Sequence, residues 1–176
     1  LLPFVEARIV DHADRDLPPG TPGELLFHRE EIIPGYYRQA GRLDEALVKL
    51  DGRLWFRTGD LAVVDEDGFY YIKGRKKDMI IVGGENVFAV EVEAVLAAHP
   101  RVREAAVKGV PATGIRAHLG ELITAYIVPA DPALTERDLR RHCYEQLPSY
   151  KVPTFITFLD RLPRNPAGKV VKDALP

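Results

Sequence analysis

The segment Arg57-Thr58-Gly59-Asp60-Leu61 places a carboxylate directly after a glycine, among residues that favour strands. A carboxylate at a strand edge can accept two hydrogen bonds from a vicinal diol such as the one ribose presents. The alternative is a turn aspartate that accepts hydrogen bonds from nearby backbone amides, which is the commoner use of Thr-Gly-Asp alone. Asp60 is therefore a candidate ligand for a sugar diol.

Two cationic side chains stand in positions that could serve an anionic substrate. Arg75 follows Gly74, and its guanidinium offers several fixed donors for phosphate or ribose oxygens; an exposed salt bridge is the alternative. Lys169 follows Gly168 in a proline-bounded loop that we expect to be mobile and exposed, so its ammonium could reach the site of another domain as a point charge. Ordinary solvated lysine is the alternative.

The double glycine in Gly83-Gly84-Glu85-Asn86 gives the backbone conformational freedom and allows close approach to a ligand. Because a helix is predicted just beyond it, its amides could also face an anion. A plain strand-to-helix turn, capped by Asn86 or a neighbour, is the alternative.

Histidine and cysteine provide no further site. The five histidines show no metal-ligand spacing, so we expect no protein metal site. His142 and Cys143 are adjacent on a predicted helix and would point apart, which argues against a nucleophile–base pair.

The first 73 residues read as all-β, forming a small antiparallel sheet or barrel. Asp51-Gly52 and Asp65-Glu66-Asp67-Gly68 are turn signals, and one or two helical turns are expected at 42–48. The predicted strands are 4–10, 24–28, 54–56, 62–64 and 69–72.

Residues 74–78 then form a charged joint before a compact α+β unit over 79–176. Its predicted strands are 79–82, 102–110, 122–128 and 155–159, and its predicted helices are 90–98 and 135–147. Thr135 is the expected N-cap of the second helix. The fold class is therefore α+β, with a β-subdomain followed by a small α+β domain.

Length and charge limit the classes of function. The chain has 176 residues and a formal net charge of -2, which gives no support to a broad nucleic-acid or membrane surface. No apolar run approaches the roughly 20 residues that span a bilayer. One cysteine suits a reducing, cytoplasmic compartment. The chain opens on Leu1 and has its only methionine at 79, so we expect it to lie within a longer protein.

Taken together, the order and spacing of these motifs resemble the C-terminal part of the AMP-forming acyl-CoA synthetases, in the adenylate-forming superfamily with luciferases and peptide-synthetase adenylation domains. The resemblance covers essentially the whole chain. It is carried by Thr21-Pro22-Gly23-Glu24-Leu25, Pro34-Gly35-Tyr36-Tyr37, Arg57-Thr58-Gly59-Asp60, Gly74-Arg75-Lys76-Lys77-Asp78, Gly83-Gly84-Glu85-Asn86-Val87, Glu91-Val92-Glu93, Tyr150-Lys151-Val152-Pro153 and Asn165-Pro166-Ala167-Gly168-Lys169.

The resemblance implies a two-step ligase. A carboxylic acid reacts with ATP to give acyl-AMP and pyrophosphate, and the thiol of CoA then displaces AMP while the C-terminal domain rotates between the steps. By residue, it implies that Asp60 binds the ribose hydroxyls, that Arg75 contacts ribose or phosphate and that Lys77 is the hinge. It further implies that Gly83, Gly84 and Glu85 line the pantetheine tunnel, and that Lys169 contacts the substrate carboxylate and α-phosphate.

The implied ligands are ATP or AMP, CoA and the Mg²⁺ that accompanies ATP, whose ligands would lie outside this chain. A protein acetyltransferase acting on Lys169 is a further implied partner. The phosphate loop and the acyl pocket would lie upstream, so these 176 residues alone are expected to be inactive.

Two alternatives stay open. One is a ligase that loads the phosphopantetheine of a carrier protein, and the other is a non-catalytic remnant used as a binding module. The sequence also departs from the family after Gly109-Val110-Pro111, where the usual aspartate is missing and the loop up to Gly120-Glu121 is longer. This departure puts the CoA contacts of that loop in doubt.

Overall fold

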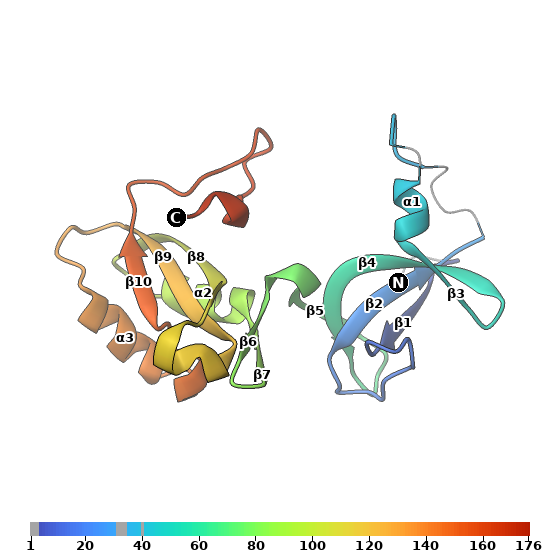
Figure 1. The fold of residues 1–176 in the computed structure, drawn as a ribbon, viewed down its shortest axis with the longest axis horizontal. Helices are drawn as coiled ribbons and strands as arrows, with labels where there is room; N and C mark the ends of the chain where they lie inside the picture. The colour runs from blue at the N-terminus through green and yellow to red at the C-terminus, as the bar shows by residue number, and fades with distance from the viewer. Residues whose placement is uncertain (1–3, 31–34, 40) are drawn as a thin grey trace. The chain divides into compact units, whose positions relative to one another are not determined.

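A computed structural model describes residues 4–30, 35–39 and 41–176. The chain divides into two compact units, Leu1–Lys77 and Asp78–Pro176, called here the first and second units (Figure 1). The sequence placed Gly74 and Arg75 in the joint, but they are the last two residues of a strand. The α+β class expected from the sequence is confirmed.

The first unit is built on one antiparallel sheet. Its strands are β1 (Glu6–Val10), β2 (Gly23–His28), β3 (Leu47–Leu50), β4 (Arg53–Val64) and β5 (Tyr70–Arg75). The long strand β4 is central, because it pairs with β2 along one edge and with β3 and β5 along the other. Of the two architectures that the sequence allowed, the described strands form the sheet and not a closed barrel.

Both faces of this sheet carry a small apolar cluster. Ile9, Leu25 and Ala62 form one, and Val10, Leu26 and Trp55 form the other. Successive strand residues point to opposite faces, so neighbouring residues of one strand are all withdrawn from water. Glu24 shares this burial with only 6% of its surface exposed, although it is charged.

The helical turns predicted at 42–48 are partly wrong. Helix α1 spans only Arg42–Glu45, and β3 begins two residues later. The strand prevails because Val48 and Leu50 pack against the Trp55 cluster, and because Asp51 and Gly52 form the predicted hairpin turn with positive φ at both residues. Of the motif at 34–37, Pro34 lies outside the described residues, and Tyr36 and Tyr37 belong to a turn closed by a hydrogen bond from Gln39 N to Tyr36 O.

The second unit has a three-stranded sheet in the order β10-β9-β8. Strand β8 spans Val102–Pro111, β9 spans Glu121–Pro129 and β10 spans Phe155–Phe158. Strand β9 pairs antiparallel with β8 and parallel with β10. A separate hairpin joins β6 (Met79–Val82) to β7 (Glu85–Phe88). The sequence analysis did not predict β7.

The central strand β9 is buried on both faces. Ile123, Ala125 and Ile127 join the main core, together with buried residues of β6, β7, α2 (Ala89–Ala97) and α3 (Glu136–Tyr144). The alternate residues Tyr126 and Val128 lie in a second cluster, which is completed from the C-terminal segment by Leu162 and Leu175. Two helices therefore cover one face, and residues 159–176 cover the other.

The helix signals in this unit are largely confirmed. Thr135 Oγ1 accepts a hydrogen bond from Asp138 N, and Asp138 Oδ2 accepts one from Thr135 N, which forms a reciprocal capping box. Helix α3 ends at Tyr144, three residues earlier than predicted. Short 3₁₀ turns complete the unit: η2 (Gly114–Leu119), η3 (Ser149–Lys151) and η4 (Lys172–Ala174). A further 3₁₀ turn, η1 (Lys76–Asp78), spans the boundary between the two units. No described helix has the length and hydropathy needed to cross a membrane.

Candidate functional site

Asp60 and Arg75 face each other across the β4–β5 ladder. They are register partners, and Arg75 Nε lies 2.7 Å from Asp60 Oδ1. A bulge between Leu61 and Ala62 shifts the register just before this pair. The structure therefore brings together the carboxylate and the guanidinium that the sequence singled out separately. The Asp60 side chain is 27% exposed and that of Arg75 is 56% exposed, so both remain accessible to a ligand.

The backbone before Asp60 is supported by a neighbour, which leaves the carboxylate available. Thr58 Oγ1 donates to Leu25 O at 2.8 Å and accepts from Asp60 N at 3.0 Å. Gly59 has φ +69°, a conformation that favours glycine. In the described part of the chain, no backbone amide donates to the Asp60 carboxylate, so it is not the ordinary turn aspartate of the alternative reading.

A shallow pocket of about 340 Å³ opens beside this pair. It is lined by Gly59, Arg75, Lys76 and Lys77, so its charged lining is cationic. Arginine and lysine side chains are the usual partners of phosphate oxygens, and a carboxylate is a partner of sugar hydroxyls. This corner of the first unit can thus hold the sugar and phosphate parts of a nucleotide.

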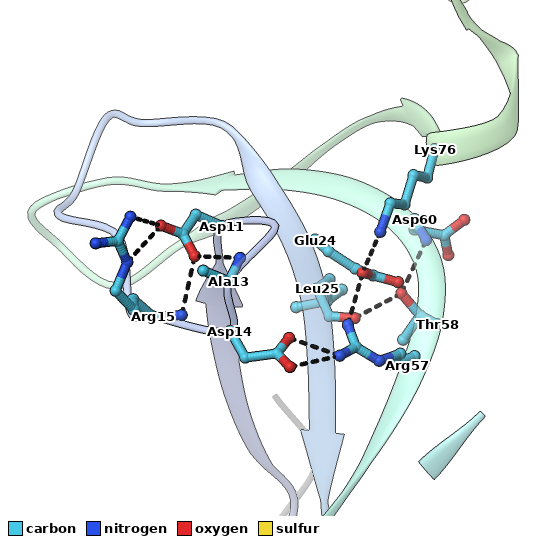
Figure 2. Close-up of polar contacts among 10 residues, drawn as sticks. All are labelled: Asp11, Ala13, Asp14, Arg15, Glu24, Leu25, Arg57, Thr58, Asp60 and Lys76. Carbon is cyan, nitrogen blue, oxygen red and sulfur yellow. Dashed lines mark hydrogen bonds and ion pairs between the residues drawn. The ribbon is translucent and has the colours of Figure 1, made fainter. Parts of the chain in front are cut away.

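A buried carboxylate that sequence reasoning missed lies next to the pocket. Figure 2 shows Glu24 between Arg57 and Lys76, with the carboxylate of Asp60 pointing away from them. Glu24 Oε2 accepts from Arg57 Nη1 at 3.0 Å and from Lys76 Nζ at 2.8 Å. Arg57 also binds both carboxylate oxygens of Asp14, at 2.6 and 2.7 Å. Burial lowers the pKa of Arg57, but Asp14 and Glu24 outweigh it, and the pKa is raised overall. The available signal was a glutamate directly before the apolar run Leu25-Leu26-Phe27 of the strand.

In the second unit, Gly83 and Gly84 form the tight turn between β6 and β7, with φ of +59° and +88°. The expectation of a strand-to-helix loop was wrong, because β7 intervenes before α2. Phe88 occupies the N-cap position of α2, so Asn86 does not cap it. A Cβ added at Gly84 would meet no atom within 4 Å, and Glu85 is exposed. The turn therefore presents open backbone to solvent.

The lengthened loop packs against this turn. Gly83 N donates to Leu119 O at 2.8 Å, and Val82 and Gly120 form a bridge. Glu121 Oε2 accepts from Ile81 N at 2.8 Å. Residues 114–119 form η2 and are not an irregular loop. The departure from the family pattern is thus a folded feature directly beside the double glycine.

Lys169 is exposed at the end of a compact turn. Asn165 Oδ1 accepts from Ala167 N and Lys169 N at 3.0 and 2.9 Å, and Gly168 has φ +80°. Arg164, which pairs with Glu104, donates to Gly168 O at 2.6 Å. Several backbone groups of this loop are therefore hydrogen-bonded within it, and Lys169 is exposed as the sequence predicted.

Two ion pairs connect other elements of the second unit. Lys151 Nζ contacts both carboxylate oxygens of Glu91, at 2.7 and 2.8 Å. Glu93 Oε1 accepts from Val107 N at 2.8 Å and lies 2.7 Å from Lys172 Nζ. The motif residues Glu91, Glu93 and Lys151 therefore connect elements of the unit. Among the residues that the structure describes, no group of His, Cys, Asp and Glu side chains is arranged to hold a metal.

Cys143 is a buried core residue, and burial raises its pKa to about 11. The neighbouring His142 bonds instead to Val95 O at 2.9 Å, which agrees with the prediction that the two side chains do not pair.

At pH 8 we expect iodoacetamide to alkylate native Cys143 about 100-fold or more slowly than it alkylates glutathione, because both the thiolate fraction and the access to the thiol are reduced. Mass spectrometry of timed samples measures the rate.

The raised pKa of Cys143 also makes the free energy of unfolding depend on pH. A thiol whose pKa is raised in the folded state favours folding below pH 9, the ordinary value, and this contribution is lost as pH rises through about 11. Denaturant should restore ordinary alkylation at pH 8. Rapid alkylation of the folded chain would show that the site opens or that the thiol is activated.

Comparison with known proteins gives matches along the whole chain. Residues 91–169 match the family described as AMP-binding enzyme C-terminal domain. The long-chain-fatty-acid–CoA ligase of Escherichia coli O6:H1 is 42% identical over 174 residues, which is 99% of this chain and 30% of that protein. A fatty acid–[acyl-carrier-protein] ligase of Streptomyces coeruleorubidus is 40% identical over 174 residues, covering 98% of this chain and 32% of that protein.

A solved structure matches as well. The o-succinylbenzoate CoA synthetase of Bacillus subtilis, in complex with its acyl-adenylate intermediate, has a TM-score of 0.86 and 33% identity, over 98% of this chain and 34% of that one. The same enzyme with ATP and magnesium ion has a TM-score of 0.84. The chain thus spans about a third of the length of the proteins it matches.

Proposed function

We propose that the chain forms the C-terminal part of an ATP-dependent acid–thiol ligase, because residues 91–169 match the AMP-binding enzyme C-terminal domain family and nearly the whole chain matches acyl-CoA ligases. The term complete ligase is used for this chain joined to an N-terminal region of the kind that its relatives have. The observation that carries the proposal is the match to such ligases over 99% of the chain.

The reaction has two steps. An oxygen of the acid's carboxylate bonds to the α-phosphorus of ATP. The bond from that phosphorus to the oxygen that bridges the α- and β-phosphates breaks, and pyrophosphate leaves. The sulfur of CoA then bonds to the acyl carbon, the bond from that carbon to the AMP oxygen breaks, and AMP leaves while the thiol proton passes to solvent. The products are acyl-CoA, AMP and pyrophosphate.

The first unit supplies the nucleotide site in this proposal. Asp60 uses Oδ1 for Arg75, and its Oδ2 has no protein partner within the described ranges, so it can accept from the ribose hydroxyls. Arg75, which lines the pocket, provides donors for ribose or phosphate oxygens. Magnesium would arrive bound to ATP, with its protein ligands in the missing N-terminal region.

The second unit supplies different groups for the two steps. Lys169 would approach the acid and the α-phosphate during adenylation, where its charge offsets negative charge that builds up as the two anions meet. Gly83, Gly84 and Glu85 would line the path of the pantetheine thiol, which the open backbone of their turn can accommodate. Rotation at Lys77, the last residue of the first unit, would exchange these two surfaces.

Two accessory features belong to the same proposal. Lys169 is exposed, so a protein acetyltransferase could reach it, and acetylation would remove the charge that adenylation needs. The free thiol of Cys143 suits a reducing, cytoplasmic compartment.

A carrier-protein acceptor is the second candidate, because the relative from Streptomyces coeruleorubidus is a fatty acid–[acyl-carrier-protein] ligase. A non-catalytic binding module is a weaker third reading. Asp60, Arg75 and Lys169 together retain the groups needed for catalysis, which argues against this reading.

The test supplies the complete ligase with ATP, Mg²⁺ and a series of carboxylic acids, and measures pyrophosphate release. We expect pyrophosphate release to depend on the acid, and a thioester to form on CoA. If a thioester formed on a phosphopantetheinylated carrier protein but not on CoA, this result would select the second candidate. No acid-dependent release with any acid would favour the binding module. Acyl-AMP formation by residues 1–176 alone would overturn the division of roles.

A further inference from the structure

Glu24 is the most deeply buried carboxylate of the first unit for which the structure shows charged partners. Its side chain is 7% exposed, and a single oxygen, Oε2, receives both Arg57 and Lys76. A charge removed from water is costly unless it is paired, so this carboxylate depends on its two cations. Neither Glu24 nor Lys76 has a role in the chemistry proposed above.

The connection from Glu24 to Lys76 crosses the central strand. Glu24 on β2 is the register partner of Leu61 on β4, and Leu61 is the partner of Gly74 on β5. Lys76 follows the end of β5 by one residue, and its side chain reaches back over β4 to the carboxylate (Figure 2). The contact therefore fastens the residue just beyond the sheet to the sheet itself.

Arg57 cannot replace Lys76 in this contact. Its Nη2 is committed to Asp14 by two short bonds, while Nη1 serves Glu24. The four side chains carry two positive and two negative formal charges, so the cluster is balanced only when Lys76 takes part. Loss of the lysine charge leaves a buried carboxylate with one shared cation.

We propose that Glu24 and Lys76 are positioning residues that fix where the chain begins to turn between the two units. Their ion pair holds Lys76 on the first unit, so that rotation starts at Lys77. The same contact keeps Arg75, the preceding residue, in register with Asp60. This inference rests on the proposed function, because it assigns the limit of the hinge in that ligase.

The ion pair between Glu24 and Lys76 would determine how many residues belong to the hinge. With the pair intact, the mobile link contains no residue before Lys77. Without it, Lys76 joins the link, and the second unit has additional orientations to search before either of its surfaces reaches the site. Hinge residues commonly affect kcat without contacting substrate. Arg75, now beside a freed residue, would also lose part of its support.

The test compares three variants of the complete ligase. Lys76→Met keeps the side-chain length and removes the charge, Lys76→Arg keeps the charge, and Lys73→Met is the control. Lys73 is an exposed lysine of β5 with no ion pair among the described residues. Acyl-AMP formation and thioester formation from supplied acyl-AMP are measured separately in each variant.

We expect Lys76→Met to lower the rate of at least one half-reaction by roughly three- to tenfold, the scale of a partly exposed ion pair. Lys76→Arg should recover most of this loss, and Lys73→Met should stay within about twofold of the parent. Equal rates in Lys76→Met and Lys73→Met would overturn the inference. Absence of activity in the unmodified ligase would instead reject the proposed function.

A second measurement needs no activity. In the 176-residue chain, trypsin should cleave after Lys77 several-fold faster in Lys76→Met than in Lys73→Met, because the released residue lengthens the accessible link. Unchanged cleavage in a variant with the parent's thermal midpoint would contradict the anchoring role. Glu24→Gln should give the same faster cleavage, since it breaks the same pair from the other side.

Discussion

Lys169→Met in the complete ligase should lower the rate of acyl-AMP formation by about 100- to 1,000-fold, the usual cost of removing one group that stabilises charge in a transition state. Thioester formation from supplied acyl-AMP and CoA should stay within about twofold, because Lys169 would be withdrawn from the site in that step. The measurement is single-turnover pyrophosphate release, followed separately from thioester formation. The thermal midpoint should not move, because the exposed ammonium makes no described contact and the turn is held by Asn165.

Arg137→Met is the matched control for this result. Arg137 is an exposed cation on α3 for which the structure shows no ion pair in its described residues, so its loss should leave both rates unchanged. A similar loss in both half-reactions of Lys169→Met would assign the lysine to substrate binding in general and not to adenylation. An unchanged rate of acyl-AMP formation would remove Lys169 from the mechanism.

Asp60→Asn should raise the KM for ATP by about 10- to 100-fold, because hydrogen bonds to a charged acceptor contribute about 1.5–3 kcal/mol. The ion pair with Arg75 would be lost at the same time. The ribose contact can be separated from this effect with 2′-deoxy-ATP and 3′-deoxy-ATP. The unmodified ligase should lose activity with each analogue, and Asp60→Asn should lose much less on the same change of substrate.

Asp67→Asn is the control for this variant, since Asp67 is an exposed aspartate in the β4–β5 turn and no described residue bonds its carboxylate. Its KM for ATP should match that of the parent. An equal penalty for the deoxy analogues in the parent and in Asp60→Asn would mean that Asp60 does not bind ribose. The effect on KM would then be assigned to Arg75.

Much of the fold is predictable from local sequence. Asp51-Gly52 identified its hairpin because few other residues accept two successive positive φ angles. Thr135 identified the start of α3 through its capping box. Strand β7 was missed because Glu85 and Asn86 are polar and exposed, and a four-residue strand paired only with β6 leaves little periodicity. The parallel pairing of β10 with β9 is a long-range contact with no local signal.

The site was predictable as a set of residues but not as a geometry. Asp60 and Arg75 were singled out separately, yet their pairing depends on a bulge between Leu61 and Ala62, and the sequence does not reveal that bulge. Glu24 was a motif residue without an assigned partner, because its ion pair with Lys76 spans 52 positions of the chain. Contacts of this kind follow from strand order, which only the structure supplies.

Residues 159–176, which cover one face of the β8–β9–β10 sheet, are synthesised last on the ribosome. Leu162 and Leu175 close that face, while Lys108 Nζ donates to Leu175 O at 2.7 Å and the Tyr126 hydroxyl donates to Pro176 O. The segment that completes the core therefore also carries Lys169. A product released before that segment is made would expose Tyr126 and Val128 to proteases and would also lack the lysine. Premature termination would thus yield chains with an exposed apolar face, which cellular proteases can remove.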